Sequence, residues 1–228
     1  MQLSQDKVAI NRKAIDEASM SEIAFYEYWR SSAAYRVRIG LKLLKLDYRS
    51  IPVDLVAGEQ RGTQNLRRNP QGLVPTLDIE GMRFSQSLAI LEYLDETRHA
   101  GWLPQDPAAK AGVRTLAYAI AMDIHPICNL RVAKHAVSFG ATMEGWMQHF
   151  ITLGLAGVEG LLVQSAPGRF CHGDAIGLAD ICLVPQVYNA LRWGVDMEPF
   201  PRVAQIAAEA SSLPEVAAAH PDRVKPAA

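Results

Sequence analysis

Strand-forming sequence is confined to one part of this chain, which limits the folds that the chain can adopt. Aromatic and β-branched segments with strand character occur between Ile23 and Phe84, whereas the sequence after Arg98 is rich in Ala and Leu at helical spacing. A chain with its strands first and only helices afterwards is expected to form a small α/β unit followed by a helical one. Its 228 residues suffice for two units, at roughly 100–150 residues each.

The first part is predicted to have the element order βαβ–α–ββα. Residues 23–29 and 48–55 are expected strands, joined by a helix that opens at residues 30–32 and ends near residue 45. A helical crossover makes those two strands parallel. The later elements are a short helix over 64–68, a strand over 73–79, a tight turn at 80–81, a partner strand over 82–84 and a helix over 85–96.

The second part is predicted to be all helical, after a linker over residues 99–107. Helices are expected at 108–138, 143–164, 178–193 and, in pieces, 200–219, with prolines near the breaks. We therefore divide the chain into an α/β domain at 22–98 and an all-helical domain at 107–221. Residues 1–21 are expected to be a disordered extension.

Composition excludes several classes of protein. Lys and Arg number 23 against 24 Asp and Glu, and this balance disfavours nucleic acid or an anionic membrane as a partner. No apolar run is expected to reach the ~20 residues of a membrane span, and the first twenty residues lack the apolar core of a signal peptide. The three cysteines form no C-x-x-C pair, which disfavours a metal site and favours the reducing cytoplasm.

The junction of the first strand and first helix carries the first candidate residues. Ser31 and Ser32 lie where an N-cap is expected, and capping alone explains a serine there. A helix N-terminus also favours an anion, and a serine hydroxyl at that point can donate a hydrogen bond to a thiolate. Arg30 precedes the helix and has the geometry to bind a carboxylate in bidentate fashion. A solvated basic helix face explains the positive charge of this segment equally well; its residues are Arg30, Arg36, Arg38, Lys42 and Lys45.

Two further pairs of residues stand at unusual positions. Pro75 enters an expected strand, where it removes a backbone donor, and a cis Val74–Pro75 bond would expose the backbone of Val74 to a neighbour. Gln86 and Ser87 open the helix after the hairpin, where capping is the simplest explanation of their side chains.

Several motifs in order give the chain a specific resemblance. RSSAAYRVRIGL, NPQGLVPTL, QSLAILEYL, WLPQDP and GDAIGLADICLVPQVYNA follow one another, and the resemblance extends from residue 23 to about residue 221. The sequence resembles the zeta-class glutathione transferases, the family of maleylacetoacetate isomerase and of bacterial glutathione-dependent maleylpyruvate isomerase. This resemblance implies a thioredoxin-like, glutathione-binding first domain, an all-helical second domain and a homodimer.

The resemblance also implies roles for residues of the first domain. Ser31, with Ser32 and Ala33 beside it, matches the segment that activates the glutathione sulfur. Val74 and Pro75 match the cis-proline loop that binds the cysteinyl part. The γ-glutamyl end is matched by Gln86 and Ser87, and Gln60 is a looser match to a glutathione contact.

In the second domain, the resemblance points to MDIHPICNLRV and to the end of a later helix. His125 and Asn129 match ligand contacts, and Arg192 matches a position that faces a substrate carboxylate; Arg30 and Arg131 are further candidates for binding the substrate. Spacing in a continuous helix places His125 and Asn129 on one face and turns Arg131 aside. A histidine before a proline is also explained by a simple kink.

Two departures from the family pattern are visible. Ala33 replaces the cysteine that usually follows the serine pair, so a mechanism that needs a protein thiol there is excluded. Gly177 stands where a capping Ser or Thr is usual, and Asp180 is expected to stabilise a helix start rather than to take part in catalysis.

The implied activity is a glutathione-dependent cis–trans isomerisation of maleylacetoacetate in aromatic amino acid catabolism. The thiolate adds to the double bond of a dicarboxylic enone, the resulting single bond rotates, and the thiolate leaves. Three alternatives stay open: isomerisation of maleylpyruvate, general glutathione transfer and a glutathione-binding scaffold without turnover. No metal is needed for any of them.

Overall fold

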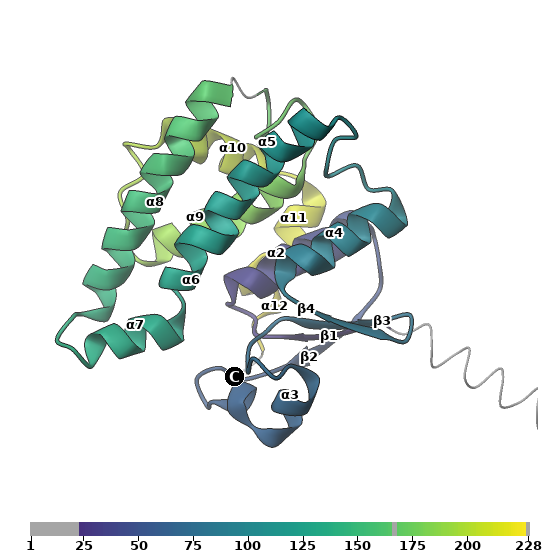
Figure 1. Ribbon diagram of the computed structural model, residues 1–228, viewed down its shortest axis with the longest axis vertical. Helices are drawn as coiled ribbons and strands as arrows, with labels where there is room; N and C mark the ends of the chain where they lie inside the picture. The colour runs from purple at the N-terminus through teal and green to yellow at the C-terminus, as the bar shows by residue number, and fades with distance from the viewer. Residues whose placement is uncertain (1–22, 166–167, 227–228) are drawn as a thin grey trace, which may run out of the picture.

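A four-stranded sheet and a set of helices share one body in the computed structural model, which describes residues 23–165 and 168–226. Every element described after residue 98 is helical, as expected (Figure 1). The extension expected at residues 1–21 lies outside the described residues. The domain limits of 22–98 and 107–221 remain our prediction.

The sheet has the strand order β2-β1-β3-β4. Its strands are β1 (Ala24–Glu27), β2 (Arg49–Pro52), β3 (Thr76–Ile79) and β4 (Met82–Ser85). β1 pairs with β2 in parallel and with β3 in antiparallel fashion, and β3 and β4 form the hairpin. The predicted parallel pair and hairpin are both confirmed.

Helices lie on both sides of this sheet. Figure 1 shows α2 and α4 on one side and α3 beyond the other. The elements are α2 (Ser32–Leu43), the 3₁₀ helix η1 (Glu59–Arg61), α3 (Thr63–Arg68) and α4 (Ser87–Arg98). The 3₁₀ helix η1, a single turn whose residues are not buried, is not expected from the sequence.

The helix expected over residues 108–138 is interrupted, so the prediction of one continuous helix is wrong. The segment consists of α5 (Pro107–Tyr118), the π-helical η2 (Ala119–Ile124), α6 (His125–Ile127) and α7 (Leu130–Val137). Asn129 has extended backbone angles, and its side-chain oxygen accepts from the N–H of Arg131, so it caps a new helix.

The remaining helices agree with the expected pattern, except that α12 lies beyond the last expected helical segment at 200–219. They are α8 (Met143–Ser165), α9 (Leu178–Arg192), α10 (Pro201–Ser211), α11 (Pro214–Ala218) and α12 (Pro221–Val224). The last three each begin with a proline, a residue suited to the first helical turn because its missing N–H has no partner there. Helix α11 returns to the first part of the chain, where its end is fixed by a hydrogen bond of 2.8 Å from Arg38 Nη1 to the carbonyl of Ala219.

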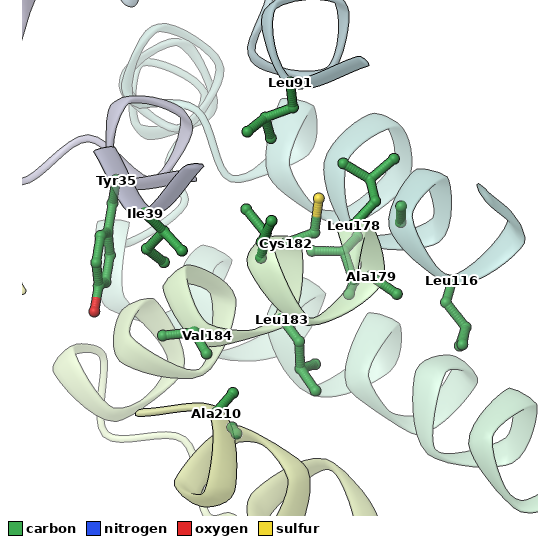
Figure 2. Close-up of a cluster of buried hydrophobic side chains, with 14 of the residues drawn as sticks. Tyr35, Ile39, Leu91, Leu116, Leu178, Ala179, Cys182, Leu183, Val184 and Ala210 are labelled. Carbon is green, nitrogen blue, oxygen red and sulfur yellow. The ribbon is translucent and has the colours of Figure 1, made fainter. Parts of the chain in front are cut away.

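Helix α9 forms the centre of the core. It packs against α2, α5 and α10, and Figure 2 shows its Cys182, Leu183 and Val184 among apolar side chains from the surrounding helices. Asp180, 1% exposed, accepts from the backbone N–H groups of Cys171 and Gly177, both at 2.8 Å. Asp180 therefore stabilises the start of α9, as expected.

Among the described helices, α8 has the length and composition of a membrane span, with 23 residues and a mean hydropathy of 1.2. The expectation that no apolar run has this length is therefore wrong. Its buried side chains recur every three or four residues on one side and belong to the hydrophobic core: Met147, Ile151, Leu155, Val158 and Leu162. This periodicity is typical of a helix that packs on one side against a globular core.

Gly154 permits the close approach of α8 and η2, and this contact can be tested. A Cβ at Gly154 would lie 2.3 Å from Cγ1 of Ile124, a β-branched side chain with little freedom to move. We expect Gly154→Ala to lower the free energy of unfolding by about 1–3 kcal/mol. In the same helix, a Cβ at Gly160 would have no atom within 4 Å. Gly160→Ala should therefore raise the free energy of unfolding by up to about 1 kcal/mol. Urea unfolding of both variants measures the difference; equal effects would contradict the assigned packing.

Candidate active site

A cavity of about 590 Å³ lies where the first part of the chain meets the helical part. The start of α2 and the loop before β3 border it on one side, and α6, α7 and the end of α9 border it on the other. Nine of the predicted residues line it: Arg30, Ser31, Ser32, Gln60, Val74, His125, Asn129, Arg131 and Arg192. Ala33, Pro75, Gln86 and Ser87 are not among the lining residues.

Ser31 combines a capping role with a position on the cavity wall. It is the N-cap of α2, and its Oγ accepts from the N–H of Ala34 at 3.3 Å. A hydroxyl that accepts in this way keeps its own proton available for another acceptor. The first N–H groups of α2 add positive potential at the same point. The two readings that the sequence left open, cap and anion site, are thus compatible in one residue.

The loop before β3 supplies a second wall. The Val74–Pro75 peptide bond is cis, as expected from the proline at the strand entrance, and Val74 lines the cavity. Gln60 also lines it, and its buried Oε1 has no hydrogen-bond partner. A buried amide oxygen without a partner is a position where a ligand donor gains a hydrogen bond.

Gln86 and Ser87 stand behind the edge of the cavity. Gln86 Nε2 donates to Oε1 of Gln71, a lining residue, at 2.8 Å. Ser87 is buried, and its Oγ accepts from Nη1 of Arg36 at 3.3 Å. Gln86 has the positive backbone angle φ of 70°, and its side chain makes no capping hydrogen bond, so simple capping does not account for it.

Positive charge dominates the cavity. Among the described lining residues, Asp and Glu are absent, while five are Lys or Arg: Arg30, Arg61, Arg131, Lys134 and Arg192. Partial burial, and then the charge of Arg30, lowers the pKa of Arg192. A cavity with this charge favours a ligand that carries more than one anionic group.

Two arginines are held in place by neighbouring tryptophans. The guanidinium of Arg30 lies 5.0 Å from the ring centre of Trp29, and that of Arg192 lies 4.8 Å from the ring centre of Trp193. Stacking of this kind restricts a guanidinium while leaving its N–H donors free for a carboxylate.

The interruption at Asn129 changes the expected geometry of the helical wall. His125, Asn129 and Arg131 all line the cavity, so the expectation that Arg131 turns aside is wrong. That expectation assumed one continuous helix, whereas Asn129 begins a second one. Burial, and then the charge of Arg36, lowers the pKa of His125 to about 3, which keeps this imidazole neutral at physiological pH.

Several other lining residues were not expected from the sequence, and three of them carry or hold positive charge. Lys134 lies three residues after Arg131 on α7, and this spacing on one helix face would have indicated it. Trp193 follows Arg192 directly in the sequence, but only the structure shows that the Arg192 guanidinium stacks on its ring. Arg61 belongs to η1, which is not expected from the sequence, and no motif marks it.

The cysteines of the chain are unsuited to act as nucleophiles. Cys128 lines the cavity, but burial raises the pKa of its thiol to about 11. Burial also raises the pKa of Cys182 to about 11 and that of Cys171 well above its usual value. No group of three or more His, Cys, Asp and Glu side chains in the described ranges is placed to hold a metal ion. A thiolate at this site has to come from a ligand.

Comparison of the sequence with known proteins shows the family of this chain. Residues 21–96 match the glutathione S-transferase N-terminal domain. Maleylacetoacetate isomerase of Rhizobium meliloti (strain 1021) is 53% identical over 211 residues, which cover 90% of this chain and 99% of that protein. The chain belongs to the maleylacetoacetate isomerase family. The zeta-class glutathione transferase architecture expected from the sequence, a thioredoxin-like domain followed by helices, is confirmed.

Solved structures of related isomerases share the fold of this chain. A bacterial zeta-class maleylpyruvate isomerase in its holo form has a TM-score of 0.86 and 36% identity, covering 90% of this chain and 100% of that one. Maleylacetoacetate isomerase from Methylobacterium extorquens AM1, with bound malonate and glutathione, has a TM-score of 0.84 and 41% identity, covering 90% and 100%.

The neutral state of His125 leads to a prediction on pH and stability. Its pKa is about 3 in the folded chain and near 6.5 in the unfolded one, so the unfolded chain binds the extra proton first. The stability that this residue contributes is present above about pH 6.5 and is lost as the pH falls below that value. We expect the free energy of unfolding to decrease by up to about 1.4 kcal/mol per pH unit from this group, less where solvent reaches the ring.

Replacement by a residue that does not titrate isolates this effect. His125→Gln should flatten the curve of unfolding free energy against pH between about pH 6.5 and pH 5, relative to the parent chain. Chemical denaturation at several pH values measures both curves. Parallel curves would show that the imidazole titrates normally in the folded protein.

Proposed function

We propose that this protein is a glutathione-dependent cis–trans isomerase that converts maleylacetoacetate to fumarylacetoacetate. The observation that carries the proposal is a cavity that combines a helix N-terminus bearing a free hydroxyl proton with several cations and no carboxylate among its described lining residues. The 53% identity to the Rhizobium meliloti enzyme supports this substrate.

The residues present fit glutathione, an anionic tripeptide thiol. The backbone of Val74 beside the cis bond suits the extended peptide of the cysteinyl part, and the unpartnered Oε1 of Gln60 offers an acceptor. Gln86 and Ser87 suit the γ-glutamyl end, while His125 and Asn129 border the same space from the helical side. The glutathione bound in the related Methylobacterium enzyme supports this assignment.

In the reaction, bound glutathione supplies a thiolate that adds to the cis double bond, permits rotation about the resulting single bond, and is then eliminated. Ser31 donates its hydroxyl proton toward the sulfur, and the N-terminus of α2 stabilises negative charge there, so both lower the pKa of the thiol. Ala33 has no thiol to compete for this role, and Cys128 stays protonated because its pKa is about 11.

The arginines bind the substrate. Arg30 and Arg192 present stacked guanidiniums to the cavity, and Arg131 faces it from α7. Their charges suit the two carboxylates of the substrate and the negative charge that develops on its enone oxygen during addition. Malonate, which also carries two carboxylates, is bound in the Methylobacterium relative.

Maleylpyruvate is the second candidate substrate, favoured by the TM-score of 0.86 to a maleylpyruvate isomerase. Both compounds carry two carboxylates on either side of a cis enone, and they differ in a short acyl spacer. The charge of the cavity suits both, so the choice between them depends on turnover.

A spectrophotometric assay of both substrates, with and without glutathione, tests the function. We expect turnover of maleylacetoacetate that requires glutathione, with a higher kcat/KM than for maleylpyruvate. Turnover without added thiol would refute the mechanism. Glutathione binding without turnover of either compound would favour a scaffold, and conjugation of unrelated electrophiles alone would favour a general transferase.

Ser31 can be tested in a way that separates capping from thiol activation. Ser31→Ala removes both and should lower kcat/KM by about a hundredfold, with a loss of about 1 kcal/mol in unfolding free energy. Ser31→Asp retains the cap but places a negative charge beside the sulfur, so stability should be kept while activity falls further.

The ultraviolet absorbance of the thiolate, titrated against pH with glutathione bound, reports the pKa that these variants change. The pKa of the bound thiol should be higher in Ser31→Ala than in the parent chain, and higher again in Ser31→Asp. An unchanged titration in Ser31→Ala would remove the hydroxyl from the mechanism.

Arg192 is expected to act on the substrate and not on glutathione. Arg192→Ala should lower kcat/KM for maleylacetoacetate by about ten- to a hundredfold, the range expected for a lost charge-assisted hydrogen bond, while the KM for glutathione stays within about twofold. Steady-state kinetics with each ligand varied in turn measures both. Arg202→Ala, a change at the start of α10 outside the cavity lining, serves as the control.

We also propose that the protein forms a homodimer in the cytoplasm and acts in aromatic amino acid catabolism. Large apolar side chains left exposed beside the α8–η2 contact, Met122 at 62% and Leu153 at 63%, support a second copy as their cover. Three free cysteines support a reducing compartment. Sedimentation analysis distinguishes a dimer from a single chain.

A further inference from the structure

Arg36 is a fully buried arginine whose charge is not compensated within the described chain. It lies on α2, is 1% exposed, and makes its one hydrogen bond from Nη1 to the hydroxyl oxygen of Ser87. Its Nε and Nη2 are buried without a partner. A buried cation of this kind is costly unless an anion or further acceptors come near it.

Arg38 shows how the same helix satisfies a buried arginine when the role is structural. It is 0% exposed, and it donates to the carboxylate of Glu27 from Nε and Nη2, at 3.0 and 2.7 Å. Its Nη1 and Nη2 also donate to the carbonyls of Ala219 and Trp29. The prediction of a solvated basic helix face is therefore wrong for both arginines. Of the two, Arg36 has N–H donors without a hydrogen-bond acceptor.

The groups around Arg36 are neutral. Ser87 is uncharged, the pKa of His125 is lowered to about 3, and the pKa of Cys182 is raised to about 11, in each case mainly by burial. These three residues come from α4, α6 and α9, so they surround the guanidinium from three elements. Burial likewise lowers the pKa of Arg36 itself.

The position of Arg36 relates it to one end of the cavity. Ser32, one helical turn earlier on α2, and His125 both line the cavity. Ser87 adjoins Gln86, whose side chain bonds to the lining residue Gln71. Arg36 therefore lies behind the wall at the end where the γ-glutamyl part of glutathione is assigned by the proposed function, on which this inference rests.

We infer that Arg36 is a positioning residue for the α-carboxylate of the γ-glutamyl group. By donating to Ser87 Oγ, it occupies an acceptor site of that hydroxyl and leaves the proton of Ser87 free for the bound carboxylate. Its charge adds to the positive N-terminal end of α4 at the same point. The ligand carboxylate is the anion that compensates this buried charge.

Two thiols that differ in one group test the inference. We would measure the dissociation constants of glutathione and of 4-aminobutyryl-cysteinylglycine, which lacks only the α-carboxylate, by titration calorimetry without substrate. In Arg36→Met, the dissociation constant of glutathione should rise about tenfold, the loss of one charge-assisted interaction, while that of the analogue stays within about twofold. With glutathione saturating, kcat should stay near the parent value.

A matched control perturbs the same place without changing charge. Cys182→Ala removes a neighbour of the guanidinium and should leave both dissociation constants within about twofold of the parent. Should Arg36→Met fail to fold, Arg36→Lys keeps the charge but not the planar fork. This variant should then raise the dissociation constant of glutathione by at least about threefold and leave that of the analogue unchanged.

An equal loss of affinity for both thiols would assign Arg36 to packing between the helices and overturn the inference. No loss for either thiol would overturn it as well. If the parent chain binds neither thiol, the proposed function itself fails, and this outcome is distinct from a parent that binds glutathione without any role for Arg36.

Discussion

The packing of α9 against α2 is the contact on which the rest of the structure depends. Both helices are buried along most of their length, one belonging to the helical part and the other to the sheet-containing part. Their contact fixes the start of α2 next to the end of α9, so Ser31 and Arg192 reach one cavity. The site is thus a product of the shared core, because Arg30 and Ser31 come from the sheet-containing part and Arg192 comes from the helical part.

Charge in this molecule is arranged around ligands that the chain itself does not supply. The cavity gathers cations without carboxylates among the described lining residues, and no residue in the described ranges provides a counter-ion for Arg36 behind it. Where the charge serves structure instead, as at Arg38 and Glu27, donors and acceptors are matched within the chain. A protein of net charge −1 can therefore present a strongly positive site, because none of the acidic residues that the structure describes lines it.

Sequence patterns predicted local features well. The Ser31 cap, the hairpin and the role of Asp180 depend on a few neighbouring residues, and all agree with the structure. The break at Asn129 was missed because Ala and Leu continue at helical spacing on both sides of it, although Pro126 and Asn129 are themselves poor helix formers. The burial of Arg36 could not be predicted either, since it depends on α9, which follows about 140 residues later and covers it.

The π-helical turn η2 has a consequence for how this part of the chain can vary. A π-helix accommodates its residues in wider turns than an α-helix, so it sets the rotation at which His125 leaves the segment toward the cavity. Removing or adding one residue within Ala119–Ile124 would replace these wide turns by turns of another hydrogen-bond spacing, and so would change the direction in which His125 leaves the segment. The number of residues here is therefore constrained more tightly than their identity, and aligned relatives that keep the site should show neither gaps nor insertions across it.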